Sequence, residues 1–177
     1  MRFAWAWLLY TWGGLHRYFG IQNSMAREFE RAVHYFSRAY NVDPTFRAAR
    51  LHRGILLGRE LGRIDEAIAD FDALLAEDPT YSLALFNRAM MWMENGRYPQ
   101  ALADMEAYVA QSDPSDENWP DAQRIVRLLF DREIVPGILP GICVTILTQA
   151  TRWDWVTSST LSRPSLNLPS LWKRTWS

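Results

Sequence analysis

The chain is poor in cysteine, in lysine and in long apolar runs, and each shortage excludes a class of protein. Its one cysteine, Cys143, permits no internal disulfide, so we expect a protein of a reducing compartment, the cytoplasm. Of its 19 basic residues only Lys173 is a lysine. This preference for arginine is typical of a GC-rich genome, and we expect a bacterial protein. The aromatic run at residues 3–10 is shorter than the roughly 18–20 residues that a membrane-spanning helix needs, so we expect it to be a helix that packs on the protein.

A strong net charge is also absent. The formal net charge is −1, which argues against a basic nucleic-acid-binding surface, and we expect no nucleic-acid partner. The near-zero sum conceals an asymmetry, because residues 1–60 carry +5, residues 61–133 carry −9 and residues 134–177 carry +3. Such polarity is suited to aligning neighbouring molecules or steering a charged partner.

Motifs of catalysis are missing as well. The sequence has no glycine-rich phosphate-binding loop and no nucleophile motif, and its paired acids fall on expected exposed helix faces. His16, His34 and His52 are evenly spaced, but we expect His34 on a different type of helix from the other two and therefore on a different surface. The sequence thus predicts no enzyme, no metal site and no cofactor.

The chain does contain a sequence motif that is repeated. Residues 62–81 read GRIDEAIADFDALLAEDPTY, and residues 96–115 read GRYPQALADMEAYVAQSDPS. A third copy, AREFERAVHYFSRAYNVDPTF, lies upstream at residues 26–46, with Arg27 where the other copies have a glycine. The copies match at steps of 34 or 35 residues, as in Ala32, Ala67 and Ala101.

Each copy has the pattern of a helix hairpin. In the middle copy the apolar residues recur at spacings of three and four, which places them on one face of an α-helix: Ile64, Ala67, Ile68, Phe71, Leu74 and Leu75. Asp78-Pro79 ends that helix, because a residue before proline avoids the helical region. The segment upstream is rich in helix formers, and Gly62 makes the turn between the two helices.

This order of small, aromatic, glycine and proline residues resembles the tetratricopeptide repeat over residues 13–114. The resemblance implies an all-α fold, a right-handed α-solenoid of about three helix hairpins. We place the repeats at residues 13–46, 47–81 and 82–115 and a capping helix at residues 116–133, which together form a domain of residues 1–133. Ile125, Leu128, Leu129 and Trp119 are expected to cover the last hairpin, and the helix at residues 3–10 to extend the first.

The remaining residues, 134–177, differ in composition. They contain four prolines, many serines and threonines, and no repeat, so we expect an irregular or disordered tail. Its four tryptophans are unusual for disorder. The sequence leaves three alternatives open: docking on the solenoid, docking on a membrane interface, or an out-of-frame ending.

The resemblance also implies a binding groove lined by the first helix of each hairpin. Three rows of equivalent positions recur along it, formed by Tyr18, His52 and Asn87, by Ile21, Ile55 and Met90, and by Met25, Arg59 and Glu94. The amide of Asn87 suits contact with a peptide backbone. The alternative for Ile55 and Met90 is that they only pack between repeats. A clamp for a terminal carboxylate, known in some members, is not supported, because His52 and Tyr18 stand at two of its places.

Two functional hypotheses follow. The first is a non-catalytic adaptor or scaffold that binds a peptide or protein segment in the groove. The alternative is a structural or assembly protein that self-associates or attaches to a membrane surface through its tryptophan-rich ends. The arginines of residues 47–59 suggest a phosphate or acidic-peptide site, or a solvated face on which each arginine pairs with a nearby acid.

Overall fold

A computed structural model of the chain describes residues 2–134, and these residues are helical apart from their turns. The first six helices are α1 (Arg2–Asn23), α2 (Ala26–Val42), α3 (Arg47–Arg59), α4 (Ile64–Glu77), α5 (Ser82–Glu94) and α6 (Tyr98–Gln111), and α7 spans Trp119–Ile134. The chain divides into two units, Met1–Leu129 and Phe130–Ser177. The expected tail at residues 135–177 lies outside the described residues.

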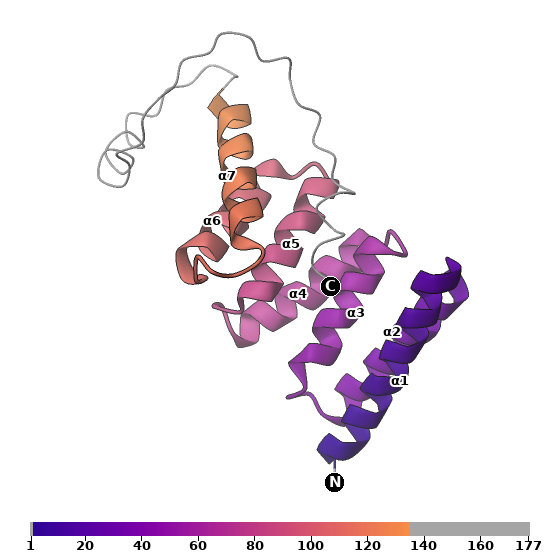
Figure 1. The fold of residues 1–177 in the computed structure, drawn as a ribbon. Coiled ribbons are helices and arrows are strands. Elements are labelled where there is room, and N and C mark those ends of the chain that lie inside the picture. The colour runs from indigo at the N-terminus through magenta and orange to yellow at the C-terminus, as the bar shows by residue number, and fades with distance from the viewer. Residues whose placement is uncertain (1, 135–177) are drawn as a thin grey trace. The chain divides into compact units, whose positions relative to one another are not determined.

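The first six helices pack as three successive hairpins (Figure 1). The extensive contacts are those of α1 with α2, α3 with α4 and α5 with α6, and smaller ones join α2 to α3 and α4 to α5. This arrangement confirms the all-α helical repeat fold. Each hairpin buries the small and aromatic residues that recur in the sequence, among them Ala32, Ala67 and Ala101, each 0% exposed.

The turns explain why the second and third hairpins have a glycine at the same place. Gly62 and Gly96 have φ values of 65° and 71°, a left-handed conformation that glycine adopts without strain. In the first hairpin, where Arg27 replaces the glycine, Ser24 takes the left-handed conformation with φ of 51°. The turn there is also shorter, because α1 ends at Asn23 and α2 begins at Ala26.

In the loop that follows each hairpin, an aspartate side chain binds the residue two positions later. The carboxylate of Asp43 accepts hydrogen bonds from the backbone N–H and the hydroxyl of Thr45, at 3.1 and 2.6 Å. Asp78 makes the same two bonds with Thr80, and Asp113 accepts from the backbone N–H of Ser115. Helix ends at Asp-Pro were therefore predicted correctly, and the aspartate itself builds the turn that follows.

The aromatic segment at residues 3–10 is part of α1 rather than a separate element. Gly13 and Gly14 do not interrupt the helix. Gly13 instead lies where the ring of Phe36 presses on α1, since a Cβ at this position would be 2.6 Å from Cε1 of Phe36. A larger residue would force the two helices apart.

Helix α7 buries one face and exposes the other, as the predicted capping helix should. Ile125 and Leu129 are buried, and Leu128 and Trp119 are partly buried. The Trp119 indole N–H donates to the carbonyl of Val109 on α6 at 3.4 Å. The polar residues Gln123, Arg124 and Arg127 are exposed.

Two buried aspartates join neighbouring helices through arginine. Asp70 and Asp104 are 5% and 7% exposed. Asp104 accepts from Nε and Nη2 of Arg88 at 2.8 and 2.7 Å, and Asp70 accepts from the same two nitrogens of Arg53. The third arginine nitrogen reaches the preceding hairpin, to Ser37 from Arg53 at 3.1 Å and to Asp72 from Arg88 at 2.7 Å. Each guanidinium therefore links its own hairpin to the one before it.

This arrangement makes a prediction for stability. Asp70→Leu should lower the free energy of unfolding by about 3 kcal/mol, because it leaves the half-buried Arg53 without its carboxylate. Adding Arg53→Met should restore part of the loss, since an apolar pair no longer contains an unpaired charge. Urea denaturation followed by circular dichroism measures both effects. Asp65→Leu, an exposed site on the same helix, is the control and should change stability by less than about 1 kcal/mol. A double variant no more stable than Asp70→Leu alone would contradict this account.

Candidate functional site

The first predicted row places one residue on each of α1, α3 and α5. Tyr18 is 55% exposed. His52 and Asn87 are partly exposed. The Asn87 amide nitrogen donates to the carbonyl of Leu83, one turn earlier in its own helix, at 2.7 Å. Tyr18 and Asn87 thus offer polar groups at the surface, whereas His52 lies deeper.

The second row is divided between surface and core. Ile21 is 54% exposed, but Ile55 is 8% and Met90 only 1% exposed. Met93, next to Glu94, is buried as well. The burial of Ile55 and Met90 agrees with the alternative that they pack between helices, so neither presents more than a small area to a ligand.

The third row is charged and accessible. Met25 and Glu94 are exposed. Arg59 is partly exposed, and its Nε lies 3.1 Å from the carboxylate of Glu60. This end of the expected groove therefore carries one cation and two acids along with Met25.

An open hollow adjoins the first row on the first two hairpins. It has a volume of about 470 Å³. Its walls come from α1, α2 and α3, and its lining residues are mainly aromatic or apolar: Trp7, Tyr10, Thr11, Gly14, Leu15, Arg17, Phe36 and His52. Trp7, Tyr10 and Phe36 give it the character of a site for an apolar side chain, with Arg17 and His52 as its basic groups.

His52 is held neutral inside this hollow. Its ring lies 5.5 Å from that of Tyr10 and 6.0 Å from that of Phe36, and the Tyr10 hydroxyl is 3.5 Å from both ring nitrogens. Burial, with a smaller effect from the positive charge of Arg17, lowers the pKa of His52 to about 4. Burial also lowers the pKa of Arg17 itself. At neutral pH the hollow therefore contains a neutral imidazole beside a cation.

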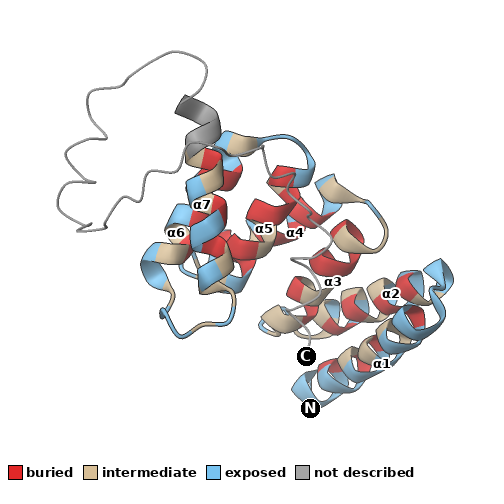
Figure 2. Ribbon diagram, turned by 45° about the horizontal axis from the view of Figure 1, so that its top comes forward, coloured by how far each residue is buried: buried red, intermediate tan, exposed pale blue. Residues whose placement is uncertain are grey.

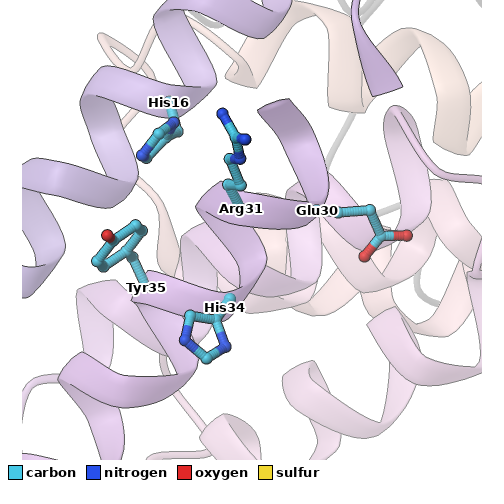
Figure 3. A pocket seen from close by; sticks show the side chains of 5 residues that line it. All are labelled: His16, Glu30, Arg31, His34 and Tyr35. Carbon is cyan, nitrogen blue, oxygen red and sulfur yellow. The ribbon is translucent and has the colours of Figure 1, made fainter. Parts of the chain in front are cut away.

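The structure corrects the expected separation of His16 and His34. Both rings lie against Tyr35, at centroid distances of 5.2 Å and 5.8 Å, and both line one open hollow with Glu30 and Arg31 (Figure 3). The prediction failed because α1 and α2 are antiparallel, which brings residues on different helices of a hairpin to a common edge. His16 Nδ1 is 2.7 Å from Oε2 of Glu28, and this hydrogen bond lowers the pKa of that carboxyl.

The described residues 2–134 contain no cluster of three histidine, cysteine, aspartate or glutamate side chains arranged to hold a metal ion. No helix in this range is long and apolar enough to cross a bilayer. The basic helix α3 is occupied with ion pairs instead of presenting free cations. Its four arginines contact carboxylates, namely Arg47 with Asp78, Arg50 with Glu77, Arg53 with Asp70 and Arg59 with Glu60.

Sequence reasoning missed the arginine–aspartate pairs. Arg53 was interpreted as one of several cations on a basic helix, and Asp70 as one of several exposed acids. The sequence does contain a signal for these pairs, because their residues recur with the repeat. The step from Arg53 to Arg88 equals the step from Ser37 to Asp72. The step from Asp70 to Asp104 is one residue shorter. Charged residues that recur at buried places of a repeat are expected to pair.

The model of the tetratricopeptide repeat matches residues 26–81 and residues 59–117. The two matches overlap and together span more than half of the chain. The chain belongs to the tetratricopeptide repeat (TPR) family. This TPR chain is also similar in fold to solved TPR domains. The TPR domain of OM64 from Arabidopsis has a TM-score of 0.60 at 16% identity, covering 72% of this chain and 98% of that domain.

Two further TPR structures have the same helix arrangement. One is the first TPR of Spaghetti (RPAP3) bound to the HSP90 peptide SRMEEVD, with a TM-score of 0.62, 17% identity, and coverage of 74% of this chain and 97% of that one. The other is the Sgt2 TPR domain from Aspergillus fumigatus, with a TM-score of 0.59, 15% identity, and coverage of 88% and 90%. At these identities the likeness establishes the fold of the TPR chain.

The environment of His52 predicts how stability changes with pH. The folded chain keeps His52 neutral down to about pH 4, whereas the unfolded chain protonates it near pH 6.5. The unfolded state therefore binds more protons between these values, and the contribution of His52 falls as the pH is lowered, by on the order of 3 kcal/mol. Above pH 6.5 this contribution is constant.

Urea denaturation at several pH values would measure the effect as a difference between variants. His52→Gln should lose the part of the pH dependence between pH 6.5 and 4 that belongs to this residue. His34→Gln, which alters an exposed histidine, should keep it. Parallel stability curves for the parent chain and His52→Gln across this window would show that His52 is not held neutral.

Proposed function

We propose that this TPR chain is a non-catalytic adaptor or scaffold that binds a peptide or protein segment along the first helices of its hairpins. The observation that supports it most directly is the hollow lined by Trp7, Tyr10, Phe36 and His52, which lies next to the exposed Tyr18 and Ile21. A structure of the same fold is described as bound to an HSP90 peptide, which supports a peptide as the kind of ligand.

The chemistry of the proposed groove follows from its residues. The hollow would take one aromatic or aliphatic side chain of the peptide. The amide of Asn87, whose nitrogen is engaged by the Leu83 carbonyl, would accept a hydrogen bond from a peptide N–H through its oxygen. Tyr18 and Ile21 would cover the bound segment at α1, and Arg59 and Glu94 would meet charged residues at its far end. Ile55 and Met90 would form the floor.

The cellular setting is part of the proposal. The single cysteine supports a reducing compartment, and we take the protein to act in the cytoplasm. The dominance of arginine over lysine supports a bacterial origin. A protein or peptide is the partner that we expect.

The groove assignment can be tested with peptides selected for binding to the full chain from a displayed library of random sequences. Fluorescence anisotropy of a selected peptide would then compare variants. Asn87→Ala and Tyr18→Ala should each weaken binding about 10-fold, because each removes a contact that we assign to the groove. Neither should change stability by more than about 1 kcal/mol, since both residues reach the surface.

Gln123→Ala is the matched control, because Gln123 is an exposed polar residue on α7, a helix to which the proposal assigns no groove residue. It should bind like the parent chain. Selected peptides that bind both groove variants with unchanged affinity would refute the groove assignment.

A further inference from the structure

Exposed apolar side chains are concentrated on α1. Of the eleven large hydrophobic side chains that are exposed in the described part of the chain, ten lie between Phe3 and Met25, and Leu83 on α5 is the other. The exposed colour along α1 in Figure 2 marks the same helix. Single exposed hydrophobic residues are normal, but a contiguous group of this size marks an interaction surface.

Five of these residues form one stripe at spacings of three and four residues. They are Trp5, Leu8, Trp12, Leu15 and Phe19, which we call the α1 seam, and they are 41–61% exposed. On an α-helix their side chains fall within an arc of about 80°. A narrow stripe with this 3.5-residue period is the pattern by which one helix packs along another. The seam therefore fits a helix as its partner.

The seam includes the face through which TPR hairpins stack on each other. Leu15 is equivalent to Ala49 and Ala84 of the next two hairpins, and both of these are 0% exposed. Phe19 is equivalent to Arg53 and Arg88, which bind Ser37 and Asp72 of the preceding hairpin. The equivalent face is thus covered in the second and third hairpins. In the first hairpin it remains exposed and carries larger apolar residues.

The order of residues in the seam reads the same in both directions. From Trp5 to Phe19 it is aromatic, leucine, tryptophan, leucine, aromatic, with Trp12 at the centre. An antiparallel second copy would therefore bring Trp5 against the second copy's Phe19, and Leu8 against the second copy's Leu15. Trp12 would meet its own equivalent at the two-fold axis. Self-complementarity of this kind is what a two-fold symmetric interface requires.

Charge favours the antiparallel over the parallel direction. Arg2 lies in the first turn of α1, and no basic residue lies in its last turn. In an antiparallel pair Arg2 approaches the carboxyl end of the other α1, where the helix dipole favours a cation. In a parallel pair Arg2 would face a second Arg2. Arg17 lines the hollow, so among the charged residues of α1 no like charges meet in the antiparallel pair.

The exposed area is sufficient for a specific contact. The five seam residues expose on the order of 500 Å² in one chain. Two copies together would bury about the 1,000 Å² that distinguishes a specific interface from an incidental one. The flanking residues of α2 would add a polar rim.

We propose that the chain forms an antiparallel homodimer in which the α1 seams of two copies pack against each other about Trp12. This interface meets the proposed peptide groove at Leu15, which also lines the hollow, whereas Asn87 lies on α5 and His52 on α3. The proposal does not depend on the proposed function, and either can fail without the other.

Sedimentation velocity and light scattering of the full chain would test the dimer. An interface of this size can reach micromolar dissociation constants, so the measurement is made at about 100 µM. The parent chain should then have twice its mass of 20.6 kDa. Trp12→Glu and Leu8→Glu should each have the monomer mass with unchanged helicity by circular dichroism. Leu83→Glu, the same type of change at an exposed apolar residue on α5, should remain dimeric. A monomeric parent chain, or dimers in all variants, would overturn the proposal.

Chemical crosslinking would test the register. With Cys143→Ser as the background, Trp12→Cys alone should be crosslinked by a short bismaleimide, because the two substituted positions meet at the axis. Leu8→Cys combined with Leu15→Cys should also be crosslinked, and Leu8→Cys alone should not. Efficient crosslinking of Leu8→Cys alone would indicate parallel helices and would contradict the antiparallel pairing.

A lipid surface is the other occupant that this test must distinguish. Vesicles of phosphatidylcholine with phosphatidylglycerol would be added to the full chain, and tryptophan fluorescence would be recorded. The proposal expects a dimer in solution and no spectral shift, because the seam is already covered. A blue shift that Trp12→Glu abolishes, from a chain that is monomeric without vesicles, would assign the seam to membranes and reject the dimer.

Discussion

The guanidinium of Arg53 joins three helices at once, and the stacking of the repeats depends on this type of contact. It binds the buried carboxylate of Asp70 on α4 and the hydroxyl of Ser37 on α2, while its own backbone is part of α3. A carboxylate as buried as that of Asp70 is tolerable only when it is paired. Arg88 repeats the arrangement one hairpin later, with Asp104 and Asp72. Because these bonds are directional, they set the register of each hairpin on the one before it, which apolar packing alone specifies less strictly.

The first hairpin has no preceding hairpin within the described residues, and its sequence differs at the same places. Phe19 stands where Arg53 and Arg88 occur, and Tyr35 stands where Asp70 and Asp104 occur. The ring of Tyr35 stacks on His16, and more distantly on Trp12, in place of an ion pair. An arginine at position 19 would have no carboxylate at position 35 to pair with. An aromatic contact between α1 and α2 therefore replaces the ion pair in this hairpin. The same substitution leaves apolar rings on the outer side of α1.

The sequence was sufficient to predict the hairpins, because their construction is local. Gly62, Gly96 and the Asp-Pro pairs mark turns whose geometry depends on neighbouring residues, and the spacing of Ala67 and Phe71 identifies a helix face. It was insufficient wherever the outcome depends on a residue in another helix. The period shows that Ile55 and Met90 lie on a face, but only the stacked structure shows that the face is covered. Likewise His16 and His34 come close because α1 and α2 pair in antiparallel directions. The repeat period alone does not show which residues of two paired helices lie together.

The proposed groove and the α1 seam use different residues of α1 except for Leu15, and a dimer would therefore affect how a partner binds. Of the five seam residues only Leu15 also lines the hollow around Tyr10, so pairing through the seam would leave most of each groove accessible. A two-fold pair would then present two grooves in opposite directions. A partner that carries two binding segments would engage both, and the second engagement would be intramolecular, with an effective concentration in the millimolar range for a short flexible connection. Weak contacts in a single groove would in that case be compatible with firm binding of a bivalent partner.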